Sequence, residues 1–240
     1  MNAIGVVAAL AAEARVLGPA VKQIGGVRRL SDGTLLDVSG MGCTAATLAA
    51  ARLIDAGASA LMSFGLAGGL DPELAAGSVV FPSEVISSDG ARFATSAQWR
   101  ERLTAAMLTQ RPVAGGKLLT RAQAIDTVAD KAAAFRETGA VAVDMESLAV
   151  AQVASAHHLP FIVARVIVDT AADVLPRAVV AASLGGQVRI WRLIGGLALA
   201  PVELGALIRL ASRYRAATRS LTAVARAVLL TRYESGARAA

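Results

Sequence analysis

The chain has 240 residues, of which 55% are hydrophobic but only 4% aromatic, and its formal net charge is +6. This length can bury one substantial core, and with so few aromatic residues the core must be packed from Ala, Val, Leu and Ile. The single cysteine, Cys43, excludes an internal disulfide and a cysteine-rich metal site, and we interpret it as a small buried side chain. We expect one domain over residues 1–240, in a reducing compartment.

The positive charge is concentrated at the C-terminal end. Residues 1–175 hold 14 basic and 16 acidic residues, whereas residues 176–240 hold 10 arginines and only Glu203 and Glu234 as acids. This shift in composition predicts a basic, apolar helical extension at about 176–240. The arginines follow a helical stripe and do not alternate with aromatic residues, so we expect no nucleic-acid partner.

Apolar segments alternate with helical patterns along the first 175 residues. The first segment, residues 4–8, predicts a strand that leads into a helix; it lacks the basic start of a signal peptide, and Glu13 interrupts it early. Alternation of this kind is typical of a largely parallel or mixed sheet with helices on both faces, where ligands bind beyond the carboxyl ends of the strands. Further strands are expected at 35–39, 60–64, 78–86, 117–119, 141–143 and 161–168, and helices at 44–56, 98–107 and 146–157.

Two carboxylates follow the expected strand 141–143. Asp144 and Glu146 stand where period-two sequence changes to the 3.6-residue period of a helix, and buried carboxylates are costly without partners. One interpretation is structural, with Asp144 capping the helix and Glu146 in its first turn. The other is that this strand-to-helix corner belongs to an active site.

Two glycine-rich turns, at residues 39–44 and 63–70, also follow expected strands. Glycines there let backbone amides approach a ligand, although neither turn matches a phosphate-binding motif and a purely structural turn is an equal alternative. His157 and His158 end the helix 146–157, where we expect a capping or surface role. No group of residues has metal-ligand spacing, so no metal is expected.

Five segments between about residues 3 and 175 form a further pattern: Glu13, Ser39-Gly-Met-Gly, Phe64-Gly-Leu-Ala-Gly-Gly-Leu, Val143-Asp-Met-Glu and Ala164-Arg-Val-Ile-Val-Asp. In this order and at this spacing they resemble the purine nucleoside phosphorylase and nucleosidase superfamily, and particularly the methylthioadenosine/S-adenosylhomocysteine nucleosidases. The resemblance implies an α/β fold: a three-layer α/β/α sandwich of the nucleoside phosphorylase type with a central mixed sheet.

The resemblance also implies roles in breaking a purine N-glycosidic bond, which requires stabilising positive charge on the ribose and neutralising the leaving base. Asp169 matches the acid that places a proton at purine N7, the alternative being a helix cap. Glu13 matches the base that orients and deprotonates the attacking water, with Arg165 as its electrostatic partner. Glu146 matches the acid that grips the ribose hydroxyls, while Asp144 matches an acid that is not itself catalytic. Substrate contacts are implied for Met145, Gly42, Ala67, Gly68 and Ile125.

This chain departs from the resembling family at two hydroxyls. The methylthioadenosine nucleosidases have a serine where this chain has Leu66, and another serine before the catalytic aspartate where this chain has Val168. These losses affect the anchoring of the water and the orientation of Asp169. The segment between Val85 and Leu103 is also shorter and less aromatic than theirs, which would open the 5′ side of the ribose.

The C-terminal sequence resembles one particular subgroup of this superfamily. Leu-Pro after the aspartate, and the later Arg-Leu-Ile-Gly-Gly and Pro-Val-Glu-Leu-Gly-Ala-Leu-Ile-Arg-Leu-Ala sequences, are similar to the hopanoid-associated phosphorylases, which are assigned to removal of adenine from adenosylhopane. Residues 190–202 are too short and interrupted to span a bilayer. The stripe that follows suits either a helix packed on the core or a membrane-interface helix whose arginines meet lipid: Arg209, Arg213, Arg215 and Arg219.

We therefore expect an enzyme that releases adenine from a 5′-substituted adenosine, and adenosylhopane is the favoured substrate. The alternatives are a methylthioadenosine/S-adenosylhomocysteine nucleosidase and a non-catalytic nucleoside-binding protein at the membrane surface. No cofactor is expected. Inorganic phosphate is the alternative to water as acceptor, but the glycine turns offer no arginine to bind it. Expected partners are a small-molecule or lipid-linked nucleoside, the membrane surface through the C-terminal segment, and further copies of the chain in a homodimer or larger homo-oligomer. The expected location is the cytoplasm, at the inner face of the cytoplasmic membrane.

Overall fold

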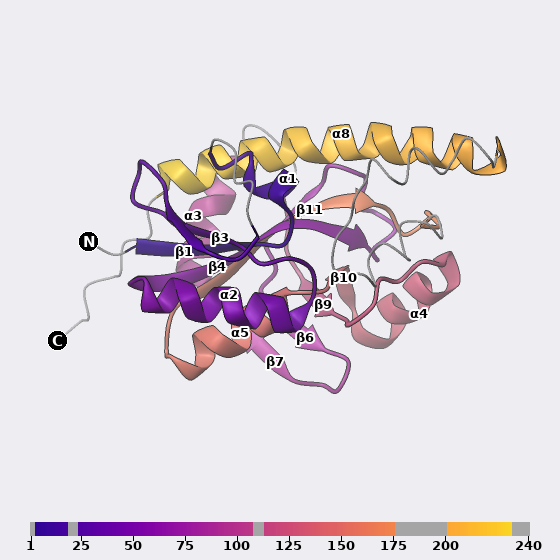
Figure 1. Ribbon diagram of the computed structural model, residues 1–240. Helices are drawn as coiled ribbons and strands as arrows, with labels where there is room; N and C mark the ends of the chain where they lie inside the picture. The colour runs from indigo at the N-terminus through magenta and orange to yellow at the C-terminus, as the bar shows by residue number, and fades with distance from the viewer. Residues whose placement is uncertain (1–2, 19–23, 108–112, 176–200, 232–240) are drawn as a thin grey trace.

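The computed structural model describes residues 3–18, 24–107, 113–175 and 201–231, with backbone alone for 201–211 and 230. Its centre is a sheet that has eleven strands within these residues, with helices on both faces (Figure 1). This is the three-layer α/β arrangement that the alternating pattern predicts. The helices are α1 (Ala11–Ala14), α2 (Cys43–Asp55), α3 (Ala97–Met107), α4 (Val128–Thr138), α5 (Ser147–Ala156) and α8 (Pro201–Leu230).

The sheet is mixed, as expected. Its main path runs β2-β3-β1-β4-β10-β9-β6-β7, while β11 pairs with β4 and β5, and β5 pairs with β8. Parallel neighbours join β1, β3, β4 and β11, whereas β10 meets the end of β4 antiparallel. The strands are β1 (Ala3–Ala8), β2 (Val27–Arg29), β3 (Leu35–Val38), β4 (Ala58–Gly69), β5 (Val79–Val80), β6 (Glu84–Ser87), β7 (Arg92–Ala94), β8 (Val113–Ala114), β9 (Lys117–Thr120), β10 (Ala140–Asp144) and β11 (Phe161–Asp169).

Small residues let the helices pack closely on the sheet. On one face, α2 and α5 bury alanines such as Ala46, Ala49 and Ala154 against the strands. On the other face, α8 packs on β11 and α3 packs on α8, with Trp99 and Leu221 among the buried side chains. The core therefore relies on alanine and branched aliphatic residues, as the composition predicts.

The prediction of one continuous strand at residues 78–86 is wrong. The structure divides it into β5 and β6, and Pro82 lies between them. Proline cannot donate a hydrogen bond to a strand partner, which accounts for the break. The sequence patterns also missed the short strands β2, β7 and β8 and the helix α4, whereas α2, α3 and α5 lie within about two residues of their expected limits.

The helix α8 packs on the core along its second half. Ala217, Leu221, Val224 and Val228 are buried, while exposed arginines lie on the opposite face: Arg215, Arg219 and Arg226. Of the two interpretations of this helix, the structure therefore shows core packing for this half. Most of the apolar segment 190–202 lies outside the described residues. No helix in the described part of the chain is long and apolar enough to cross a membrane.

Candidate active site

Carboxylates and one arginine gather where β1, β10 and β11 end. Glu13 follows β1, Asp144 ends β10, Asp169 ends β11, and Arg165 lies within β11. The parallel register of β11 on β4 sets Arg165 opposite Gly65, and a bulge then brings Asp169 opposite Gly68. The ends of these strands thus form the edge at which α/β sheets of this kind bind ligands.

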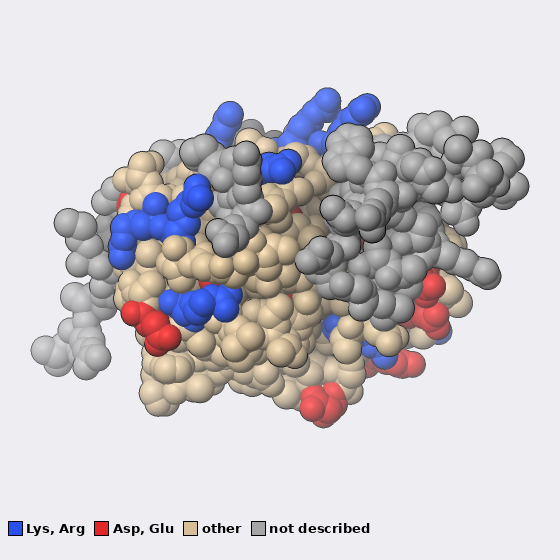
Figure 2. All heavy atoms as spheres, viewed as in Figure 1, with Lys and Arg blue, Asp and Glu red and all other residues tan. Residues whose placement is uncertain are grey.

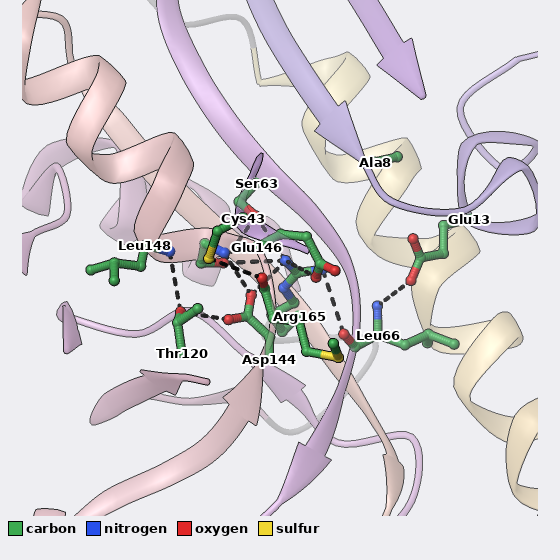
Figure 3. Close-up of polar contacts among 12 residues, drawn as sticks. Ala8, Glu13, Cys43, Ser63, Leu66, Thr120, Asp144, Glu146, Leu148 and Arg165 are labelled. Atoms are coloured by element: carbon green, nitrogen blue, oxygen red, sulfur yellow. Dashed lines mark hydrogen bonds and ion pairs between the residues drawn. The ribbon is translucent and has the colours of Figure 1, made fainter. Parts of the chain in front are cut away.

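Arg165 is the centre of this group and is almost fully buried (Figure 3). Its Nη2 donates to Asp144 Oδ2 at 2.6 Å and to Ser63 Oγ at 2.8 Å. The same nitrogen lies 3.2 Å from Ser147 Oγ and 3.7 Å from Glu146 Oε2. The guanidinium is therefore already neutralised by neighbouring carboxylates, which satisfies the requirement that a buried charge be paired.

Asp144 holds both Arg165 and the start of α5. Its Oδ2 accepts from Ser147 N at 3.1 Å, and its Oδ1 accepts from Thr120 Oγ1 at 2.6 Å. The structural interpretation is thus correct for Asp144, which accepts from the first backbone amide of α5. It is wrong for Glu146, which precedes the helix as its N-cap residue and does not lie in its first turn. The side chain of Asp144 is occupied by protein donors, which agrees with a structural rather than a catalytic role.

Glu13 is held in place by backbone amides. Its Oε1 accepts from Leu66 N at 2.9 Å and its Oε2 accepts from Leu10 N at 3.0 Å. Burial raises the pKa of Glu13, and the charge of Arg165 opposes this shift. The absence of a side chain at Gly65 makes room for this arrangement, because a Cβ there would lie 2.6 Å from both Glu13 Oε1 and Arg165 Nη1.

Glu146 links the glycine turn before α2 to the arginine at the centre of the site. Its Oε1 accepts from Gly42 N at 2.9 Å, so the turn before α2 meets the turn before α5. Gly42 has φ of 91°, a conformation that favours glycine. Burial raises the pKa of Glu146 to about 7; Arg165 opposes the shift and Asp144 adds to it. Met145, next to it, is half-buried, and its carbonyl accepts from Cys43 Sγ at 3.3 Å. Cys43 is itself only partly buried, so our interpretation of it as a buried side chain is wrong.

Asp169 has a partner that the sequence analysis missed. Lys131, on α4, is completely buried and places its Nζ 2.5 Å from Asp169 Oδ2. The only signal in the sequence is that Lys131 shares the inward side of α4 with Ala134, where an apolar residue is usual. The alternative of a helix cap does not describe Asp169, because Asp173 makes the hydrogen bonds to Thr170 N and Oγ1, each 2.8 Å.

The other residues singled out in the sequence fall into two groups. Ala67 and Gly68 lie on the last part of β4, and Ile125 is buried in a cluster with Leu70 and Val143. A Cβ at Gly68 would lie 3.2 Å from Asp169 Oδ2. In contrast, His157 and His158 are exposed at the end of α5, as expected.

Leu66 and Val168 occupy the two positions where the resembling family has serines. Both are half-buried and pack against the apolar cluster beneath α3 and α8. Within the described ranges no group of His, Cys, Asp and Glu side chains is arranged to hold a metal ion.

The fold and the acid-lined edge together define an α/β/α enzyme of the nucleoside phosphorylase and nucleosidase class. The sequence profile of the Phosphorylase superfamily matches residues 5–192, and the chain belongs to this superfamily. No curated protein matches the chain significantly.

Solved structures support the same fold. The 5′-methylthioadenosine/S-adenosylhomocysteine nucleosidase of Neisseria meningitidis, in complex with methylthio-immucillin-A, has a TM-score of 0.71 at 20% identity, covering 96% of this chain and 100% of that chain. The Helicobacter pylori nucleosidase of the same name, with butyl-thio-DADMe-Immucillin-A, has a TM-score of 0.67 at 17% identity over 93% and 97% of the two chains. Futalosine hydrolase of Helicobacter pylori strain 26695 also has a TM-score of 0.67, at 16% identity over 93% and 97%.

Proposed function

We propose that the protein hydrolyses the N-glycosidic bond of a 5′-substituted adenosine and releases adenine. The observation that carries this proposal is the convergence of three buried carboxyl groups on the glycine-rich end of β4. Glu13 lies beside Gly65, Asp169 lies beside Gly68, and Glu146 reaches the same group through Arg165. A cleavage with oxocarbenium character needs an acid for the base, a carboxylate for the sugar and a base for the water.

Each acid has one role in the proposed reaction. The bond from ribose C1′ to purine N9 breaks, its electrons pass into the purine, and the proton of the Asp169 carboxyl group goes to N7. Glu146 accepts hydrogen bonds from the ribose hydroxyls and stabilises the positive charge on the sugar. Glu13 takes a proton from the water whose oxygen bonds to C1′. Burial raises the pKa of Asp169, which favours the protonated form that this step needs.

The charges at the site favour water over phosphate as acceptor. Phosphate recognition ordinarily uses arginine or lysine side chains that are available to the anion. Arg165 is bound by Asp144 and lies beside Glu146, while Lys131 is bound by Asp169. These two described cations of the site are thus neutralised by carboxylates.

Adenosylhopane is the substrate that we propose, on the basis of the C-terminal sequence that resembles the hopanoid-associated phosphorylases. Such a substrate is a lipid, so the proposal includes peripheral contact of the C-terminal segment with the inner face of the cytoplasmic membrane. We further propose a homodimer or larger homo-oligomer. Methylthioadenosine/S-adenosylhomocysteine nucleosidase is the second candidate, and the structural likeness to that enzyme from Neisseria meningitidis favours it.

The test is an assay of adenine release. We expect the wild-type chain to release adenine from adenosylhopane in phosphate-free buffer, and Asp169→Asn to reduce turnover by about 100-fold or more, the scale of general-acid catalysis. Asp55→Asn changes an exposed aspartate at the end of α2 and should have no effect. Methylthioadenosine and S-adenosylhomocysteine, assayed in parallel, distinguish the two candidate substrates.

Three outcomes would contradict parts of this proposal. A strict requirement for phosphate would exclude hydrolysis. Near-normal turnover of Asp169→Asn would remove Asp169 from the mechanism. Binding of the nucleosides without any release of adenine would favour the non-catalytic alternative.

A further inference from the structure

A buried lysine lies behind the proposed acid. Lys131 Nζ is 2.5 Å from Asp169 Oδ2, 2.8 Å from the carbonyl of Thr170 and 3.0 Å from the carbonyl of Asp173. An ammonium group has three protons to donate, so these three acceptors satisfy it completely. The side chain is thus fixed in one position, although it projects from α4 and its partners lie at the end of β11 and in the turn that follows.

Stability alone is a weak reason for this pair. Removing a lysine and an aspartate from water is costly, and apolar replacements of buried ion pairs are often neutral or stabilising. Val168, the residue before Asp169, packs against the apolar cluster beneath α3 and α8 and offers no polar group to the carboxylate. Within the described residues, Lys131 is therefore the side chain that holds the Asp169 carboxyl group.

We propose that Lys131 is a positioning residue for Asp169: it holds Oδ2, leaves Oδ1 to carry the proton to purine N7, and neutralises the carboxylate that remains. This inference rests on the proposed function. In the step itself the O–H bond of Asp169 breaks and the N7–H bond forms, while Lys131 keeps all three of its protons. No further reactant is required.

The charges around Asp169 agree with this role. Burial raises the pKa of Asp169, whereas Lys131, first by its charge and then by its hydrogen bond, lowers it; Arg213 lowers it further. Arg213 reaches this group from α8 through an ion pair with Asp173. In the described part of the chain, the charged groups near Asp169 are therefore Lys131 from α4, Asp173 from the turn and Arg213 from α8. A change at Lys131 leaves the other two in place.

The experiment compares the pH dependence of turnover in the wild-type chain and in Lys131→Met. Without the cation the pKa of Asp169 should rise, so the loss of activity at alkaline pH should move up by about one pH unit or more. Turnover at the optimum should fall by about tenfold or more, because the carboxyl group is no longer held. Lys117→Met changes a lysine on β9 whose Nζ donates to the carbonyl of Thr138, away from Asp169, and should leave both unchanged.

A double variant separates this role from general damage to the fold. If Lys131 acts through Asp169, Lys131→Met should cause no further loss of turnover when added to Asp169→Asn. If Lys131→Met shows no cooperative thermal unfolding, the pH profile is measured on Lys131→Gln, which keeps a donor to Asp169 but not the charge.

The outcomes distinguish the inference from the proposed function. An unshifted alkaline limb in a folded Lys131 variant, or an additive loss in the double variant, overturns the inference alone. Failure of the wild-type chain to release adenine overturns the proposed function, and the inference with it.

Discussion

At the scale of single residues, the main feature of the site is an excess of buried acid. The carboxyl groups of Asp144, Glu146 and Glu13 all interact electrostatically with Arg165, so a single positive charge is shared among three acids. Such an arrangement cannot keep every carboxyl group ionised at little cost, and the pKa of Glu146 of about 7 is one result. The site is therefore built at the expense of stability, as is common where charge is held ready for catalysis.

Glu146→Gln tests this cost. The pKa of Glu146 lies above its ordinary value of 4.5, so its contribution to the free energy of unfolding is fully present below 4.5 and is lost as pH rises through about 7. Glutamine cannot ionise, so the variant should match wild type at about pH 5 and unfold at a temperature a few degrees higher at about pH 8. Its turnover should fall by about 100-fold, because the variant lacks the carboxylate that we propose stabilises the ribose.

The measurement is thermal unfolding at the two pH values, together with adenine release. Glu101→Gln, at an exposed position of α3, is the control and should change neither. If the Glu146→Gln variant is less stable at the higher pH, the attraction between the Glu146 carboxylate and Arg165 outweighs the cost of burying that carboxylate.

At the scale of secondary-structure elements, the register between β4 and β11 assembles the site. This register places Arg165 opposite Gly65 and Asp169 opposite Gly68. A shift of one residue would turn every side chain of β11 to the other face of the sheet. Both glycines leave space for charged groups. The glycine-rich sequence that we expected to form a turn is therefore the end of strand β4, where it makes room for the side chains of the site.

Gly65→Ala should damage the site directly. The new Cβ would lie 2.6 Å from Glu13 Oε1 and Arg165 Nη1, so one or both side chains must move. We expect turnover to fall by at least about tenfold, since small displacements of positioned groups are costly. Gly115→Ala is the matched control, because a Cβ there meets no atom within 4 Å. Adenine release measures both, and near-normal turnover of Gly65→Ala would show that Glu13 need not be held where the structure has it.

At the scale of the whole molecule, α8 gives one face a basic edge. Figure 2 shows Lys and Arg side chains along the side of the molecule that α8 occupies in Figure 1. Arg215, Arg219 and Arg226 are exposed there, opposite the buried face of the helix. Arg213, in contrast, is half-buried and paired with Asp173, so it is not available to lipid as the sequence analysis expected. The side chain of Arg209 lies outside the described residues.

The proposed membrane contact can be tested by co-sedimentation with vesicles that contain anionic phospholipid. A variant with Glu at Arg215, Arg219 and Arg226 should bind less, because each basic residue near such a surface contributes about 1 kcal/mol. The control carries the same charge changes at Arg29, Arg92 and Arg121, which are exposed on β2, on β7 and directly after β9, and should bind like wild type. Equal losses in both variants would mean that net charge, and not α8, governs binding.

The sequence by itself determined the alternation of strands and helices, the mixed three-layer class and the positions of the acids at strand ends. These features depend on local periodicity and on the spacing of motifs, which neighbouring residues fix. The break at Pro82 was also present in the sequence, but the apolar residues on either side of it hid the end of the strand.

Only the tertiary structure decided which distant polar and charged groups meet. Lys131 and Asp169 are 38 positions apart, and Gly42 and Glu146 are 104 apart. The bond between Arg165 and Asp144, like the ion pair that joins α8 to the turn after β11, also depends on the order of strands in the sheet. Such contacts form between segments brought together by sheet register and helix packing, so no local pattern encodes them.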